Sequence, residues 1–217
     1  EELSGHNAFA DATPDMVEAI VDGIAALAEG EWAPLNRIGD EHPAHLKDGK
    51  VVFPDGFKAA YDAFVEGGWA GIAAPQEFGG QGMPFSLGMV TLESLGAANM
   101  GFNLCPTLSL GAIEAIYAHG TEAQKAAYLP KLATGKWSGT MNLTEPHAGS
   151  DVGALSSTAT PRGDGTYHIA GQKIFITWAD NDFTENVCHL VLARLPDGAE
   201  GTRGISLFMV PKIIPDA

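Results

Sequence analysis

The chain has 217 residues, of which 45% are hydrophobic, and this length allows one large or two small domains, of which we favour two. Its 27 acidic and 12 basic residues leave a formal net charge of -15, which repels nucleic acid and anionic membrane surfaces. The charge therefore argues against a nucleic-acid-binding protein. Any phosphate-bearing ligand must therefore be held by local donors such as backbone N–H groups and hydroxyls.

Three residues in a row predict the start of the first helix. Thr13 is an N-cap residue, Pro14 suits the first helical position, and Asp15 is an acid in the first turn. The apolar residues that follow recur at helical spacing, so one face of this helix is expected to be buried. These residues are Val17, Ile20, Val21, Ile24 and Leu27.

Helical periodicity continues through the first two-thirds of the chain. Thr121 and Gln124 form the signature of a capping box at the start of another helix. Together the segments predict a small helical bundle. The remaining expected helices are at about 86–98, at about 108–119 and at about 55–66, where Phe57, Tyr61, Phe64 and Val65 would point inward.

Near Lys136 and Trp137 the hydrophobic period changes to alternation, and strands are expected at 157–162, 166–170, 188–193 and 205–210. Four or five strands are few for a closed sandwich or barrel. We therefore expect an α+β fold in which an N-terminal α-helical domain, 1–136, precedes an antiparallel β domain, 137–217. This second domain would be an incomplete barrel or sandwich that has been truncated.

The stretch from Met141 to Asp151, M-N-L-T-E-P-H-A-G-S-D, is the most informative part of the sequence. Thr144 and Ser150 present hydroxyls, and Pro146 favours an extended residue before it. Gly149 can adopt positive φ or allow a ligand to approach the backbone closely. The stretch thus combines hydroxyls, a rigid turn and small residues.

A second segment, Lys173–Thr177, offers an aromatic face beside another hydroxyl. As part of a strand, Phe175 would point opposite to Ile174 and Ile176, and ordinary core packing is the alternative interpretation of its ring. Thr177 is expected at the end of this strand, a common place for ligand contacts. The two segments together predict a pocket for a flavin, with strands that merely share a polar rim as the alternative.

The same residues carry a family resemblance. T-E-P-x-A-G-S-D at Thr144–Asp151, followed by G-Q-K-x-F-I-T at Gly171–Thr177, resembles the acyl-CoA dehydrogenase family of flavoenzymes, and P-x-E-F-G-G-x-G at Pro75–Gly82 resembles its helical domain. The similarity covers nearly the whole chain. His147 and the segment 185–196 are most similar to the large bacterial branch that includes 3-methylmercaptopropionyl-CoA dehydrogenase.

The resemblance implies FAD as cofactor and gives a role to individual residues. Thr144 would lie at the pyrimidine side of the isoalloxazine, Phe175 against the ring, and the Thr177 hydroxyl near N5. Ser150 would also lie near the pantetheine arm of the substrate. Many relatives have tryptophan at the position of Phe175 and a glycine-rich turn where this chain has Trp178. The implied cofactor-binding set is Met141, Leu143, Thr144, Gly149, Ser150, Phe175, Ile176 and Thr177.

The implied reaction is α,β-dehydrogenation of an acyl-CoA thioester to trans-2-enoyl-CoA, in which a carboxylate removes the α proton and hydride passes to flavin N5. The family's catalytic glutamate belongs to a C-terminal helical domain beyond Ala217, and Glu145 is not its substitute. We therefore expect no catalytic residue in this chain, weak or no FAD binding and no turnover. The implied partners are acyl-CoA, an electron-transferring flavoprotein and further copies in a homodimer or tetramer.

Three alternatives stay open: an acyl-CoA oxidase, a non-catalytic flavoprotein of the same fold that acts as a binding or protective protein, and a scaffold without cofactor. Cys105 and Cys188 form no C-x-x-C pair, which favours a reducing, cytoplasmic location. No apolar run approaches membrane-spanning length. His42 and His45 are separated by Pro43 and lack a third ligand, so no metal site is expected.

Overall fold

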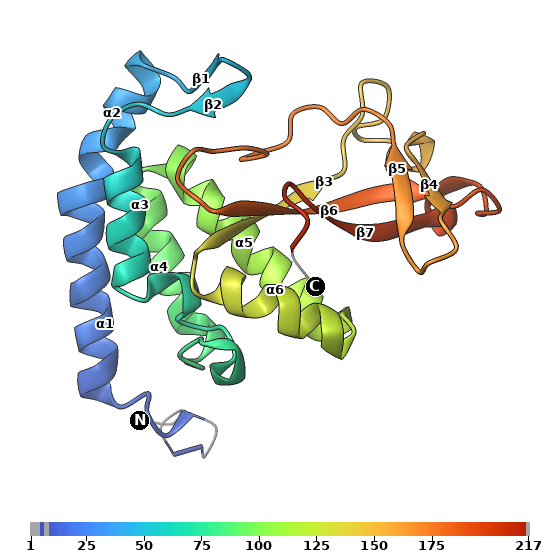
Figure 1. Ribbon diagram of the computed structural model, residues 1–217. Coiled ribbons are helices and arrows are strands. Elements are labelled where there is room, and N and C mark those ends of the chain that lie inside the picture. The colour runs from blue at the N-terminus through green and yellow to red at the C-terminus, as the bar shows by residue number, and fades with distance from the viewer. Residues whose placement is uncertain (1–4, 7–8, 216–217) are drawn as a thin grey trace.

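The computed structural model describes residues 5–6 and 9–215, and its helices precede its main sheet along the chain (Figure 1). A single π-helical turn, Ala28–Trp32, joins the first two α-helices, and short 3₁₀ turns cover Trp69–Gly71 and Gln76–Phe78. The expected helical part is thereby confirmed. The α-helices are α1 Pro14–Leu27, α2 Ala33–Glu41, α3 Phe57–Glu66, α4 Phe85–Ala98, α5 Met100–His119 and α6 Glu122–Ala133.

The start signals of α1 and α6 act as the sequence predicts. The Thr13 side chain accepts a hydrogen bond from the Met16 N–H, and Thr121 forms a complete capping box with Gln124. The buried face of α1 is narrower than expected, because Ile20 and Ile24 are buried whereas Val21 is 39% exposed. The inner face of α1 is therefore built around two isoleucines one helical turn apart.

Two features of the helical part were not anticipated from the sequence. A small antiparallel hairpin, β1 His45–Lys47 and β2 Lys50–Val52, separates α2 from α3. Helix α5 begins earlier than expected because the Asn99 side chain accepts a hydrogen bond from the Phe102 N–H, and the helix continues through Pro106. Because proline lacks the N–H that continues a helix, a proline at this position argues against a helix, and the first two turns of α5 are not predicted from the sequence.

The second part of the chain is a five-stranded sheet in which β6 is the central strand. β7 pairs with β6 antiparallel, and β4 pairs with β5 antiparallel, but β6 runs parallel to both β3 and β4. The expected antiparallel sheet is thus corrected to a mixed one, because the chain between β3 and β6 makes a long crossover back to the same end. The strands are β3 Trp137–Asn142, β4 Thr158–Pro161, β5 Tyr167–Ala170, β6 Asn186–Arg194 and β7 Ile205–Pro211.

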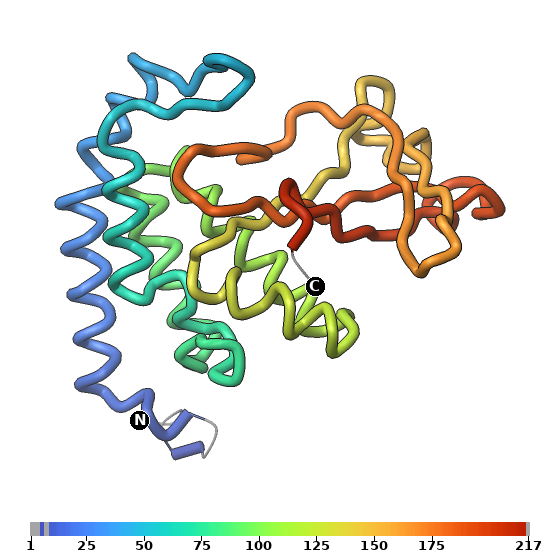
Figure 2. The backbone as a smooth tube through the Cα atoms, viewed as in Figure 1, coloured from blue at the N-terminus to red at the C-terminus, as the bar shows by residue number. Residues whose placement is uncertain are grey.

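Helices and sheet share a hydrophobic core. One buried cluster joins Ala112 and Ile113 of α5 to Leu129 of α6, and to Trp137 of β3 and Cys188 of β6. A second cluster, centred on the Trp32 ring stacked 4.1 Å from that of Phe102, fills the space among the helices. In Figure 2 the chain between β5 and β6 leaves the sheet and runs across to the helical part before it returns. The proposed division at 136/137 stays a prediction.

Strand β3 approaches α5 so closely that Gly139 admits no side chain. A Cβ there would lie 2.5 Å from the Ala112 Cβ, whereas a Cβ at the exposed Gly111 of α5 would meet no atom within 4 Å. We expect Gly139→Ala to lower the free energy of unfolding by about 1–3 kcal/mol. The same substitution at Gly111 should raise it by up to about 1 kcal/mol, because alanine is the better helix former.

Urea denaturation of both variants measures this difference directly. Equal stabilities for the two alanine variants would contradict the close contact between β3 and α5.

Candidate functional site

The turn in the first segment is closed by two backbone hydrogen bonds. The Glu145 N–H donates to the Ala148 carbonyl at 2.9 Å, and the Ala148 N–H donates back to the Glu145 carbonyl at 3.1 Å. Pro146 and His147 occupy the two central positions, where proline's fixed φ suits the first. The turn buries the Glu145 side chain, which is 2% exposed, and leaves Pro146 and His147 in solvent.

The buried Glu145 carboxylate is held by five donors. One oxygen accepts from the Ser156 N–H at 2.7 Å and from the Ser156 hydroxyl at 3.0 Å. The other accepts from the Ser157 N–H at 3.0 Å, the Ser157 hydroxyl at 2.5 Å and the Lys173 ammonium at 2.8 Å. Burial by itself raises the pKa of Glu145, but the hydrogen bonds from Lys173, Ser157 and Ser156 outweigh it and hold the pKa far below its usual range.

Lys173 also brings the second segment against the first. Its ammonium donates to the Leu143 carbonyl at 3.0 Å, and the neighbouring Ile174 N–H donates to the Thr144 carbonyl at 3.0 Å. The residues that the sequence analysis placed in two separate motifs are therefore adjacent in space. This meeting of the two segments creates the candidate site.

The second segment is not a strand, which corrects the sequence-based expectation. No strand covers 171–185, and the residues around Thr177 form a bend and a turn closed by the Ala179 N–H on the Ile176 carbonyl at 3.3 Å. Phe175 and Trp178 both have φ of 55°, a conformation that costs about 1–3 kcal/mol for residues other than glycine. The Phe175 ring is 89% exposed, so core packing does not explain it.

The other expected site residues differ in their exposure to solvent. Met141, near the end of β3, is 37% exposed. The side chains of Leu143, Thr144 and Ile176 are half-buried. The exposed members are Gly149, Ser150 and Thr177, and Gly149 does not adopt positive φ. Within the described part of the chain, the side-chain hydroxyls of Thr144, Ser150 and Thr177 make no hydrogen bond. An open aromatic face with free hydroxyls nearby suits a flat polar ligand.

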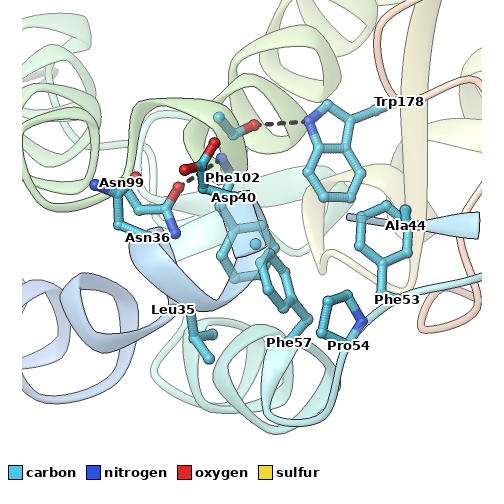
Figure 3. A pocket seen from close by; sticks show the side chains of 12 residues that line it. Leu35, Asn36, Asp40, Ala44, Phe53, Pro54, Phe57, Asn99, Phe102 and Trp178 are labelled. Atoms are coloured by element: carbon cyan, nitrogen blue, oxygen red, sulfur yellow. Dashed lines mark hydrogen bonds between the residues drawn. The ribbon is translucent and has the colours of Figure 1, made fainter. Parts of the chain in front are cut away.

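A cavity of about 300 Å³ lies beside the site, between α2, the segment after β2 and the start of α5 (Figure 3). Its walls include the rings of Phe53, Phe57, Phe102 and Trp178, and Asp40 lies next to Phe102. None of the expected cofactor-binding residues lines it. The sequence signal for this cavity is Trp178, which lines it. This large aromatic residue directly follows Thr177, where the family resemblance leads us to expect a glycine-rich turn.

Other chemistry is sparse in the part of the chain that the structure describes. No three His, Cys, Asp or Glu side chains there could hold a metal ion. His42 and His45 do not share a helix, because α2 ends at Glu41 and His45 lies in β1. Cys105 and Cys188 are free and buried, and burial raises the pKa of each thiol to about 12. Among these residues no helix is long and apolar enough to cross a membrane.

Comparison with known proteins matches both parts of the chain to one family. Residues 14–136 match the family described as acyl-CoA dehydrogenase, N-terminal domain, and residues 140–216 match acyl-CoA dehydrogenase, middle domain. The chain is 54% identical over 199 residues to 3-methylmercaptopropionyl-CoA dehydrogenase of Ruegeria pomeroyi, which covers 89% of this chain and 34% of that protein. It spans about a third of the length of three curated relatives to which it is 36–54% identical.

Solved structures have a similar fold. A chain of the structure described as electron transferring flavoprotein of Acidaminococcus fermentans superposes with a TM-score of 0.74 at 32% identity, covering 94% of this chain and 49% of that one. An acyl-CoA dehydrogenase of Bacillus anthracis complexed with FAD superposes with a TM-score of 0.72 at 26% identity, covering 93% of this chain and 31% of that one.

The Glu145 site yields a stability prediction. We expect Glu145→Gln to lower the free energy of unfolding at pH 7 by about 3–5 kcal/mol, because the Lys173 ammonium stays buried without its carboxylate. Asp62→Asn is the matched control, since it removes a carboxylate 2.7 Å from Lys58 in an exposed pair worth about 0.3–0.5 kcal/mol.

The pH dependence follows from the direction of the shift. Because the pKa of Glu145 is lower in the folded chain, its contribution is complete above the unfolded value of about 4.3 and is lost as the pH falls below it. Urea titrations between pH 5 and pH 3 should therefore show a smaller loss of stability for Glu145→Gln than for the parent. Parallel pH profiles would refute the assignment.

Proposed function

Because this chain belongs to the acyl-CoA dehydrogenase family, we propose that its two converging segments form one part of the FAD site of an enzyme that oxidises acyl-CoA thioesters. The observation that carries the proposal is the contact between Ile174 and Thr144, which brings both motifs to one exposed surface. A solved relative described as complexed with FAD supports the choice of cofactor.

The exposed residues have the chemistry that the isoalloxazine requires. The open Phe175 ring would lie against it, and the hydroxyls of Thr144 and Thr177 would contact its polar edge and N5. Ser150 would serve the cofactor and the pantetheine arm of the substrate. FAD, when bound, supplies the acceptor for the substrate's β hydrogen as hydride. Met141, Leu143, Gly149 and Ile176 complete the proposed surface.

The proton-abstracting carboxylate has to come from elsewhere. Glu145 lies in the site's own turn, but its two oxygens accept from five donors and its pKa is held far below the usual range. Such a group neither reaches an α proton nor has the basicity to remove it. We propose that Glu145 orders the site and that the base lies outside residues 1–217, so that this polypeptide by itself does not turn over substrate.

The substrate and the partners are proposed from the relatives. The high identity to a 3-methylmercaptopropionyl-CoA dehydrogenase puts short acyl-CoA thioesters, including one with a thioether, first among the candidates. An electron-transferring flavoprotein is the proposed acceptor and a homodimer or tetramer the proposed assembly of the full-length protein. The two buried, free cysteines suit a reducing compartment such as the cytoplasm.

Anaerobic titration of the full-length protein with a panel of acyl-CoAs tests the reaction. We expect the flavin absorbance to bleach with short-chain thioesters, with formation of the trans-2-enoyl-CoA. Residues 1–217 alone should produce no enoyl-CoA. A full-length protein without flavin, or one that no thioester reduces, would contradict the proposed function, whereas rapid reoxidation by oxygen would favour an oxidase.

The role of Phe175 is tested by binding. We expect Phe175→Ala to raise the dissociation constant of the full-length apoprotein for FAD at least about 10-fold, because it removes buried area and ring stacking worth about 0.5–1.5 kcal/mol. Phe175→Tyr keeps the ring and should bind almost as the parent does. Since the side chain is 89% exposed, the stability of the apoprotein should change by no more than about 0.5 kcal/mol. An unchanged FAD affinity for the alanine variant would remove Phe175 from the site.

A further inference from the structure

Trp178 connects the flavin-facing segment to the N-terminal helical part. It follows Thr177 directly in the chain, and its ring stacks on that of Phe53, with centroids 4.7 Å apart and planes 8° apart. Phe53 belongs to the segment between β2 and α3. Figure 3 shows the two rings side by side on one wall of the cavity. Trp178, which lies in the long loop between β5 and β6, is thus anchored on the N-terminal helical part.

Two hydrogen bonds reinforce this anchor. The Trp178 indole N–H donates to the Gly101 carbonyl in the first turn of α5 at 2.9 Å. The Phe53 N–H donates to the Asp182 carboxylate at 3.3 Å, four residues further along the loop. Phe183 then inserts its buried ring beside Phe53 and Tyr61. The loop is therefore bound to the helical part at three positions, Trp178, Asp182 and Phe183.

The backbone explains why such an anchor is needed. Both Phe175 and Trp178 have φ of 55°, which bulky residues adopt only where the surrounding structure holds them. Ile176 and Thr177 lie between these two positions, and the Thr177 side chain has no partner of its own among the described residues. The direction of its hydroxyl thus depends on the residues on either side. Of these two side chains, only that of Trp178 makes holding contacts with the described residues, because Phe175 is almost fully exposed.

We propose that Trp178 is a positioning residue, which acts through its stacking on Phe53 and its hydrogen bond to Gly101 to orient the Thr177 hydroxyl toward the flavin. The inference rests on the proposed function and extends it to the part of the chain before α3. The hairpin side of the helical part, through Phe53, would then influence the rate of hydride transfer without contacting substrate or cofactor.

The test uses the full-length protein, in the apo form and with FAD. In the apoprotein, Trp178→Ala should speed hydrogen exchange of the amides of 175–182 at least about 10-fold, because the loop loses its anchor. In the loaded enzyme, it should slow flavin reduction at saturating acyl-CoA at least about 10-fold with little change in KM, since a small misplacement of a catalytic contact is costly.

Three further variants separate positioning from general stability. Trp178→Phe retains the stack but loses the indole N–H, and it should recover most of the reduction rate. Phe53→Leu removes the stack from the opposite side and should reproduce the effects of Trp178→Ala, and it takes the place of that variant if the latter does not fold. Tyr167→Ala breaks a ring contact with Phe208, 5.1 Å between centroids on the sheet, and should change neither measurement.

The two proposals fail in different ways. If no acyl-CoA reduces the parent protein, the proposed function is wrong, and hydrogen exchange in the apoprotein still decides whether Trp178 orders the loop. If the parent is reduced normally and Trp178→Ala matches it in exchange and in reduction rate, the positioning role is overturned. A loss of exchange protection spread over the whole chain would also overturn it, because it would show a purely structural role.

Discussion

The ion pair between Glu145 and Lys173 is the constraint on which the candidate site depends. Neither residue is near the other in the sequence, and both side chains are almost completely buried. A charge buried in this way is stable only with its partners in place, so the chain must bring the two motifs together in order to satisfy both groups. The additional bond from Lys173 to the Leu143 carbonyl then sets which part of each motif faces the other.

The crossover between β3 and β6 provides the length of chain that this arrangement requires. Since β3 and β6 are parallel, the intervening chain has to return to the starting end of the sheet, and it carries both the β4–β5 hairpin and the loop with Phe175 on the way. The loop extends to the helical part, where Trp178 stacks on Phe53 and donates a hydrogen bond to the Gly101 carbonyl. The site therefore lies where the helical part meets the sheet, and both contribute to its geometry.

This arrangement separates order from chemistry. The charged groups with strong partners, Glu145 and Lys173, lie beneath the surface and hold the backbone in place. The groups suited to a ligand, such as the Phe175 ring and the Thr177 hydroxyl, remain open to solvent and lack partners among the described residues. Preorganised donors and rings of this kind need little rearrangement when a ligand binds, which favours affinity and a defined orientation.

The sequence by itself determined the elements whose signals are local. Thr13 and Thr121 marked helix starts, and the two motifs identified the family, because caps and short ligand-binding segments depend on neighbouring residues. Only the tertiary structure decided the parallel pairing of β3 with β6, the early start of α5 and the bend at Phe175. An Ile-Phe-Ile-Thr run has the composition of a strand, but the hydrogen bond from the Ile174 N–H to the distant Thr144 carbonyl and the docking of Trp178 on Phe53 override that local preference.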